Sequence, residues 1–253
     1  MSPPAHLGIA TRSQRKRSAP SERHNGLMRQ FCRLFRRLDA SAGTRERVAA
    51  LANHFRSVPP EDAAWALHLL LGKRRRRLIS SRRLREVALE ASGLPAWLFE
   101  ASYAHVGDSA ETIALLIGSR AEPSSAVDAA AARDPMQAAA VARPLHHWPL
   151  HHWMETVLPA LAKLEEEAQS LSLRQLWSGV PSEELLVMLK LLSGTFRVGV
   201  GEGLVLRALA SISGLDVAEL QHRLMGGFEP SATAYGALLR PGDETQQPIA
   251  RPY

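Results

Sequence analysis

The chain has 253 residues, 45% of them hydrophobic, which is enough to bury the core of one large domain or of two. It shows no run of the roughly 20 apolar residues that cross a bilayer and no apolar signal at its N-terminus. Its single cysteine, Cys32, excludes an internal disulfide or a cysteine metal cage, so we expect a protein of the reducing cytoplasm. Residues 1–100 contain 20 Lys and Arg against 8 Asp and Glu, and residues 101–253 contain 11 against 17, which indicates nucleic acid or an anionic membrane as the partner.

The N-terminal arm, residues 1–27, is basic and rich in Ser and Pro, and it is expected to be disordered. Three amphipathic segments then predict helices, the first from Leu27, the second capped by Thr44 and the third opened by Pro60. Their predicted buried faces are Phe31, Leu34, Phe35 and Leu38; Val48, Leu51, Ala52 and Phe55; and Trp65, Leu67, Leu69, Leu70 and Leu71. Cys32 lies in the first helix, where a buried thiol is expected rather than a nucleophile.

A strongly basic loop follows the third helix. Its cations are Lys73, Arg74, Arg75, Arg76, Arg77, Arg82 and Arg83. The planar fork of arginine suits phosphate, although a GC-rich genome also favours arginine and a run of charges is often only a solvated face. Both interpretations of this loop remain open at this point.

Further helices are predicted over Leu84–Ala91, from Leu94 and over Ala110–Ile117. The last of these is expected to be capped by Asp108 or Ser109. Trp97 and Phe99 are expected to lie in the core rather than to stack on bases. This part of the sequence therefore continues a helical body around the basic loop.

Residues 118–143 are rich in Ala, Ser, Pro and Asp and are typical of a linker or a weak helix. The pentapeptide Pro144–Trp148 is then repeated as Pro149–Trp153, which brings four histidines together between His146 and His152. A metal site is one interpretation, but no cysteine or carboxylate is interleaved and a tandem duplication explains the pattern, so no metal is expected. A helix is predicted over Thr156–Ser170, with an exposed acidic face.

A glycine-rich loop joins two apolar helical runs near residues 185–192 and 204–209. It contains Gly194, Gly199, Gly201 and Gly203 and one cation, Arg197. Glycine removes the Cβ that would hold a partner's backbone away, and free N–H groups at the start of the second helix suit an anion such as phosphate. The alternative is a plain glycine turn between two core helices.

The two loops belong to a pseudo-repeat. Ala66–Gly72 aligns with Met188–Gly194, Leu84–Ala88 with Leu206–Ala210, and Ser92–Leu94 with Ser213–Leu215. The spacing between the two glycines differs by one residue between the copies, since Gly72 to Gly93 is 21 residues and Gly194 to Gly214 is 20. This repeat suggests that both halves present a loop to the same polyanion.

No strand alternation is found, and the sequence predicts an all-α fold of about a dozen helices in two pseudo-repeated halves. We expect the halves to be residues 28–117 and 144–240, joined by 118–143. Together they form a helical domain over 28–240. Residues 241–253 are polar and interrupted by proline, as in a linker, and the protein is expected to be a monomer without a membrane segment.

The order and spacing of these blocks resemble the N-terminal DNA-binding domain of ATP-dependent DNA ligases, particularly the bacterial three-domain enzymes, over about residues 28–253. The matching blocks are Phe35-x-x-Leu38, Val48–Leu51 with Phe55, Pro60–Ala66, Leu71–Lys73, Gly93–Pro95 with Trp97–Glu100, Val106–Asp108 with Ala110–Ala114, Phe196–Val200 after Gly194, and His222–Gly226. The resemblance implies binding across the minor groove on both sides of a nick. It also implies roles in DNA repair, recombination and replication, and a location at the bacterial nucleoid.

The same family seals nicks with a lysine in a Lys-x-Asp-Gly motif, which takes AMP from ATP. None of Lys16, Lys73, Lys163 and Lys190 is followed by this motif, so this chain is not expected to ligate DNA alone. ATP and Mg²⁺ would belong to a catalytic core in cis or in trans. Arg251–Tyr253 resembles the start of the segment that leads into that core, and the chain is expected to be either a fragment or a truncated gene product.

The resemblance assigns DNA-binding roles to both loops. Gly194, Thr195, Gly199 and Gly201 are expected to allow close approach of the DNA backbone, with Arg197 as a groove or phosphate contact. The basic residues of the first loop, Lys73 to Arg77 with Arg82 and Arg83, are expected to form an electrostatic clamp. The alternative is a helical interaction module without an enzyme, which uses its basic surface for a protein partner.

Overall fold

The structure, a computed structural model, describes residues 27–72, 77–118, 148–178, 180 and 182–241. All regular elements in these ranges are helical, which confirms the all-α prediction. They are α1 (Leu27–Ala40), α2 (Thr44–Ser57), α3 (Pro60–Leu70), α4 (Ser81–Ser92), α5 (Ala96–Val106), α6 (Ser109–Gly118), α8 (Leu150–His152), the π-helical turn η4 (Trp153–Val157), α9 (Leu158–Lys163), α10 (Glu166–Ser178), α11 (Ser182–Ser193), α12 (Glu202–Ser213), α13 (Val217–Met225) and α14 (Ala232–Leu239). The predicted N-terminal arm, joining segment and C-terminal linker lie almost wholly outside the described residues.

The predicted apolar faces form the core. All four predicted residues of α1 are buried, and so is Cys32, as expected of an inert thiol. Most of α3 is buried as well, consistent with its apolar sequence. The predicted cap of α2 was wrong: the N-cap is Gly43, and Thr44 is the first helical residue. At α6 the prediction was right, because Asp108 Oδ1 accepts a hydrogen bond from the Glu111 amide at 2.9 Å.

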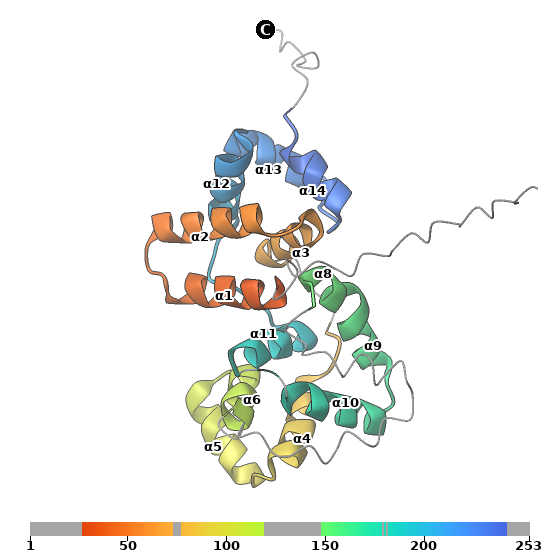
Figure 1. Ribbon diagram of the computed structural model, residues 1–253. Helices are drawn as coiled ribbons and strands as arrows, with labels where there is room; N and C mark the ends of the chain where they lie inside the picture. Colours follow the sequence, from red (N-terminus) through yellow and green to blue (C-terminus); the bar gives the residue numbers. More distant parts are fainter. Residues whose placement is uncertain (1–26, 73–76, 119–147, 179, 181, 242–253) are drawn as a thin grey trace, which may run out of the picture.

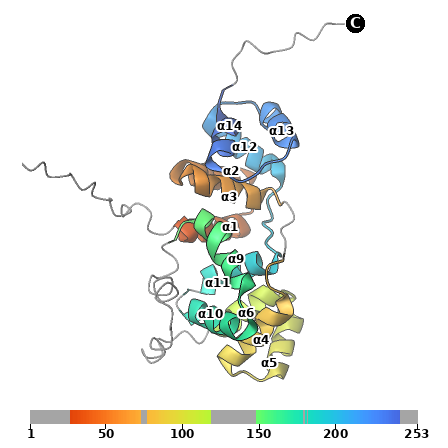
Figure 2. The same ribbon diagram turned by 90° about the vertical axis from the view of Figure 1, so that its right-hand side faces the viewer.

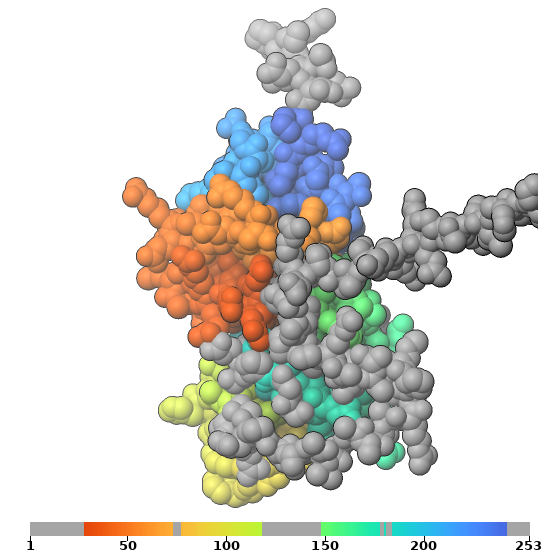
Figure 3. Space-filling model, viewed as in Figure 1, coloured from red at the N-terminus to blue at the C-terminus, as the bar shows by residue number. Residues whose placement is uncertain are grey.

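The helices form two lobes, and each lobe contains helices from before and from after residues 119–147 (Figures 1 and 2). The first lobe combines α1, α2 and α3 with α12, α13 and α14, through contacts of α2 with α12 and of α3 with α14. The second lobe combines α4, α5 and α6 with α10 and α11, through contacts of α6 with α11 and of α4 with α10. Neither lobe is therefore a continuous stretch of the chain. Figure 3 shows α1–α2 and α12–α14 as one continuous end of the molecule.

The pseudo-repeat is visible in the backbone. Gly72 and Gly194 end α3 and α11 with φ angles of 65° and 69°, and Gly93 and Gly214 end α4 and α12 with φ angles of 60° and 75°. These left-handed conformations suit glycine, because a Cβ is disfavoured there. In each copy a serine before the second glycine accepts a hydrogen bond from the leucine after it, as in Ser92–Leu94 and Ser213–Leu215. The two copies share geometry as well as sequence.

Two local predictions were wrong. The helix expected over Thr156–Ser170 is interrupted at Leu164, whose backbone is extended. The Leu161 carbonyl there accepts hydrogen bonds from the Leu164 amide at 3.4 Å and from buried Gln169 at 3.0 Å. Trp97 is 69% exposed, whereas Phe99 is 2% exposed. The side chains of Trp97 and Phe99 are separated by two positions on a helix and point in nearly opposite directions. Because α5 packs on the lobe through its Phe99 face, Trp97 faces outward.

Candidate nucleic-acid interface

The two loops of the pseudo-repeat are the connections between the lobes. The first crossover, residues 71–80, joins α3 to α4, and the second crossover, residues 194–201, joins α11 to α12. The described end of the first crossover, residues 77–80, and the second crossover lie on the same side of the molecule in Figure 2. The amides of Leu78 and Ile79 both donate to the Leu192 carbonyl at the end of α11, at 3.0 and 3.1 Å. The structure therefore brings together two loops that are more than 110 residues apart in sequence.

The second crossover is fixed at its two ends. After Gly194, the Thr195 amide donates to the Lys190 carbonyl at 3.0 Å, and the Thr195 and Ser193 hydroxyls lie 2.8 Å apart. Phe196 is buried against Phe31 and Phe35 of α1, with ring centroids 5.6 and 5.4 Å away. Val200, also buried, anchors the far end. The backbone between Phe196 and Val200 is therefore held at both ends.

The outer side of the second crossover is open. Arg197 and Gly199 are exposed, and so is Thr195. An added Cβ at Gly199, Gly201 or Gly203 would meet no atom within 4 Å, and none of the three has a positive φ. Neither internal packing nor backbone strain requires glycine at these positions. Glycines at these exposed positions leave room for an external backbone to approach.

The second crossover leads into the N-terminus of α12. Gly201 is the N-cap and provides no side-chain acceptor for the first amides of the helix. Within the described residues, the amides of Arg197, Gly199 and Gly201 have no hydrogen-bond acceptor. These free donors, together with the positive end of the helix dipole, suit an anion, although Glu202 in the first turn weakens that attraction.

The first crossover is only partly described. Lys73, Arg74, Arg75 and Arg76 lie outside the described residues. Arg77 is exposed, and Ser80 caps α4 by accepting a hydrogen bond from the Arg83 amide at 3.1 Å. Arg82 and Arg83 therefore belong to the first turn of α4 rather than to the loop.

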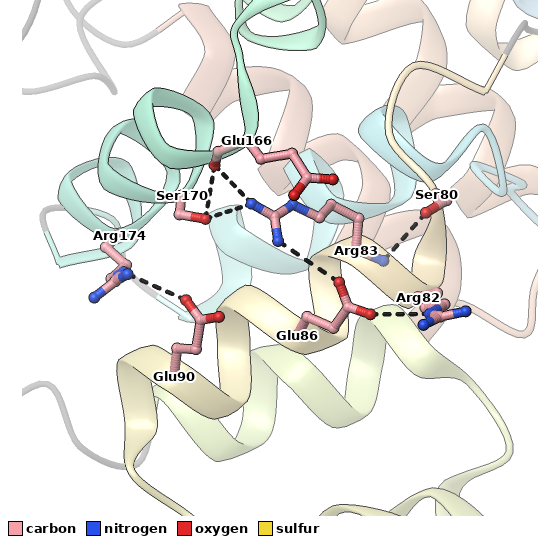
Figure 4. Close-up of polar contacts among 8 residues, drawn as sticks. All are labelled: Ser80, Arg82, Arg83, Glu86, Glu90, Glu166, Ser170 and Arg174. Atoms are coloured by element: carbon pink, nitrogen blue, oxygen red, sulfur yellow. Dashed lines mark hydrogen bonds and ion pairs between the residues drawn. The ribbon is translucent and has the colours of Figure 1, made fainter.

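These two neighbouring arginines differ in their surroundings. The side chain of Arg82 is 89% exposed and pairs with Glu86 at 2.9 Å, which lowers the pKa of that carboxyl. The side chain of Arg83 is only 18% exposed, and its Nη2 donates to the Glu166 carbonyl and the Ser170 hydroxyl of α10, both at 2.6 Å (Figure 4). Glu90 and Arg174 form a second link between α4 and α10 at 3.1 Å. Arg83 thus holds the start of α4 against α10.

An open pocket of about 430 Å³ lies beside the first crossover. Its lining residues are Leu78, Ile79, Ser80, Arg82, Arg83, Glu86, Leu164, Glu166 and Gln169. The acidic residues offset the two guanidinium groups, so the pocket has no strong preference for an anion.

One arginine of the interface was not predicted from the sequence. Arg47 of α2 donates from Nη1 to the Gly199 carbonyl at 3.0 Å and from Nε to the Ser41 carbonyl at 2.7 Å. Arg47 and Gly199 are 152 residues apart, and helical periodicity contains no signal for such a contact. The contact arises because α2 lies beside α12 in the first lobe, although the two helices are far apart in the sequence.

One residue of the histidine-rich segment, His151, binds a buried carboxylate of the protein. Asp62 of α3 is buried, and its Oδ1 accepts hydrogen bonds from the His151 amide at 2.8 Å and from Nδ1 at 2.7 Å. Burial lowers the pKa of the neighbouring His152. His146 and His147 lie outside the described residues, and within the described ranges no three metal-ligating side chains gather.

Comparison with known families matches residues 27–210 to the DNA ligase N terminus. The chain belongs to the family of N-terminal domains of ATP-dependent DNA ligases. This ligase domain match includes both crossovers and ends within α12, while α13 and α14 lie beyond it and complete the first lobe. No curated protein matches the chain. None of the described helices has the length and apolar content needed to traverse a bilayer.

Proposed function

We propose that the chain binds duplex DNA without sequence preference, as the DNA-binding part of an ATP-dependent DNA ligase. The two crossovers contact the sugar–phosphate backbone across the minor groove. Phosphate contacts fix the position of a protein on DNA and carry little sequence information. The processes served are DNA repair, recombination and replication at the bacterial nucleoid, and the protein acts as a monomer.

The observation that supports this function most strongly is the hydrogen bonding of the first crossover to the end of α11. Through Leu78 and Ile79, it ties Arg77 of one crossover to the start of the other, which carries Arg197. Both arginines are exposed and have no ion-pair partner within the described residues. Unpaired cations on adjoining loops are available to a polyanion, unlike Arg85 and Arg174, which pair with Glu100 and Glu90.

The individual residues take different parts in this proposal. Gly199 and Gly201 let the DNA backbone approach, Thr195 and Arg197 contact it, and Gly194 shapes the start of the crossover. Arg77 and Arg82 add positive charge together with Lys73 to Arg76. Nη2 of Arg83 donates inside the protein and its Nε is buried, so we assign Arg83 to support of the first crossover rather than to direct contact.

The sealing reaction itself requires a catalytic core, in cis or in trans. That core would supply the lysine nucleophile and hold ATP and Mg²⁺. The present chain contributes the grip on the substrate, and no ligation is expected from it alone.

A salt titration tests the proposal. Fluorescence anisotropy with nicked and intact duplexes of two unrelated sequences measures affinity between about 50 and 200 mM salt. About 5 phosphate contacts predict a log–log slope near −4 to −5, equal for both sequences. A slope near zero contradicts the proposal. A protein partner would instead be indicated if glutamate at Arg197 and Arg74–Arg77 left DNA binding unchanged and abolished capture of that partner.

A further inference from the structure

We infer that Arg47 is a positioning residue that holds the second crossover in its DNA-binding conformation. The inference rests on the proposed function and adds a residue outside both crossovers. Arg47 reaches from the first turn of α2 to the Gly199 carbonyl at 3.0 Å, in the middle of the open loop. The same guanidinium reaches the Ser41 carbonyl at 2.7 Å, in the turn between α1 and α2.

This pair of contacts ties the crossover to a rigid part of the first lobe. The turn between α1 and α2 is short, and both helices are anchored in the core. A planar guanidinium with two occupied donors has a defined orientation, whereas a lysine ammonium is a single point charge on a flexible stem. Arg47 therefore transmits the position of the turn to Gly199.

The contact also decides which polar groups of the loop face outward. The Gly199 carbonyl is held by Arg47, and the next amide, Val200, donates to the Val198 carbonyl at 2.7 Å. Both polar atoms of the peptide after Gly199 are thus satisfied inside the protein. The amides of Arg197, Gly199 and Gly201 remain available to a phosphate oxygen. Without Arg47 the Gly199 carbonyl is free to turn outward, where it would repel a phosphate.

The chain offers two matched controls on the same helix. Arg45, two residues earlier, is exposed and has no partner within the described residues, so Arg45→Gln removes the same charge without the contact. Arg56, near the end of α2, donates to the Ser211 carbonyl of α12 at 3.1 Å. Arg56→Gln therefore removes an arginine–carbonyl bond made by the same helix, but to α12 rather than to the crossover.

The test compares the affinities of Arg47→Gln, Arg47→Lys, Arg45→Gln and Arg56→Gln for a nicked duplex, together with amide hydrogen exchange of residues 195–203 in the free proteins. Loss of one charge-assisted hydrogen bond predicts that Arg47→Gln weakens binding about tenfold. Arg47→Lys, which keeps the charge, is expected to weaken binding similarly. Both Arg47 variants are expected to exchange faster at 195–203, while Arg45→Gln and Arg56→Gln stay close to wild type in both measurements.

Two results would overturn the inference. In one, Arg47→Lys binds like wild type and Arg47→Gln matches Arg45→Gln, so that only charge matters. In the other, hydrogen exchange of 195–203 is unchanged in both Arg47 variants. Failure of the proposed function gives a different result, because the wild-type protein itself would then lack salt-dependent DNA binding, while the exchange measurement on the free proteins would still report on the Arg47 contact.

Discussion

The two crossovers occupy related positions in the pseudo-repeat and have different chemistry. The first is rich in arginine: Arg77 is exposed, and Arg83, which follows the crossover in the first turn of α4, is anchored inward. The second contains one arginine and two glycines, Gly199 and Gly201, whose Cβ positions are open. Both begin at a left-handed glycine, Gly72 and Gly194. The shared geometry fixes where each loop leaves its helix, and the side chains then give one loop charge and the other close approach.

In the proposed function, this difference separates two contributions to DNA binding, one from charge and one from close approach. Charge acts over about 8–10 Å and is screened by salt, whereas close approach depends on shape and on oriented amides. We therefore expect substitutions in the first crossover to change mainly the salt dependence. Substitutions in the second crossover should change affinity even at fixed salt.

The largest predicted effect is a loss of stability at low pH, at the buried residues that pack beneath the second crossover. Burial lowers the pKa of His54 to about 4, and its ring lies 6.1 Å from Phe31, which packs on Phe196. In the unfolded chain the His54 ring takes up a proton near pH 6.5, whereas in the folded protein it does so only near pH 4. The contribution of neutral His54 to the free energy of unfolding is therefore fully present above pH 6.5 and is lost as the pH falls towards 4. The decrease is expected to be about 3 kcal/mol.

Urea denaturation at pH 7 and pH 4.5 measures this change. His54→Leu is the matched variant, because it keeps an apolar group of similar size without a titrating ring. It should lose much less stability between the two pH values than the wild type does. An equal loss in both proteins would show that His54 does not couple pH to this lobe.

Arg197→Glu is the next largest effect, since it removes a charge-assisted contact and adds repulsion. The loss is expected to be about 1.5–3 kcal/mol of binding free energy, with the salt slope reduced by about one unit. Anisotropy titrations at several salt concentrations measure both quantities. Arg45→Glu, at an exposed arginine of α2 that has no partner within the described residues, is the control for net charge. Equal losses in the two variants would contradict a specific role for Arg197.

The neighbouring pair Arg82 and Arg83, in the first turn of α4 directly after the first crossover, separates binding from support. Arg83→Gln leaves α10 acceptors unpaired and should lower the free energy of unfolding by about 1–3 kcal/mol. Arg82→Gln removes only an exposed pair and should change it by less than about 1 kcal/mol. Arg82→Gln should instead reduce the salt slope of DNA binding. Thermal unfolding and anisotropy on the same samples distinguish the two, and a reversed pattern would rule out the inward role of Arg83.

A smaller effect separates two glycines of the second crossover. Gly194→Ala places a Cβ at a φ of 69°, which should lower the free energy of unfolding by about 1–2 kcal/mol. Gly199→Ala has open space and no positive φ, so stability should be unchanged and DNA affinity reduced. Thermal unfolding and DNA titration of both variants provide the measurement. Unchanged affinity in Gly199→Ala would mean that DNA does not approach this residue closely.

Helical periodicity and glycine spacing predicted a large part of this molecule. The buried face of α1, the cap at Asp108 and the paired loops of the pseudo-repeat all follow from local pattern. The errors have a common physical origin. Trp97 was expected in the core because of its size, but the side of α5 that packs is decided by the lobe around it.

Contacts between segments that are distant in the sequence could not be predicted from it either. Arg83 donates to α10 and Arg47 to Gly199 because segments distant in the sequence supply backbone carbonyls. Every residue type has such a carbonyl, so the sequence does not mark these acceptors. A basic run therefore predicts where charge is concentrated. It does not predict which of its arginines remain free.

Amide chemical-shift mapping with a nicked duplex tests the two-crossover interface most directly. We predict that the largest shifts fall on residues 77–82 and 194–203, with α5 and the exposed face of α10 unchanged. The shifts should diminish together as salt is raised. Shifts centred on α5, around exposed Trp97, with the two crossovers silent, would contradict it.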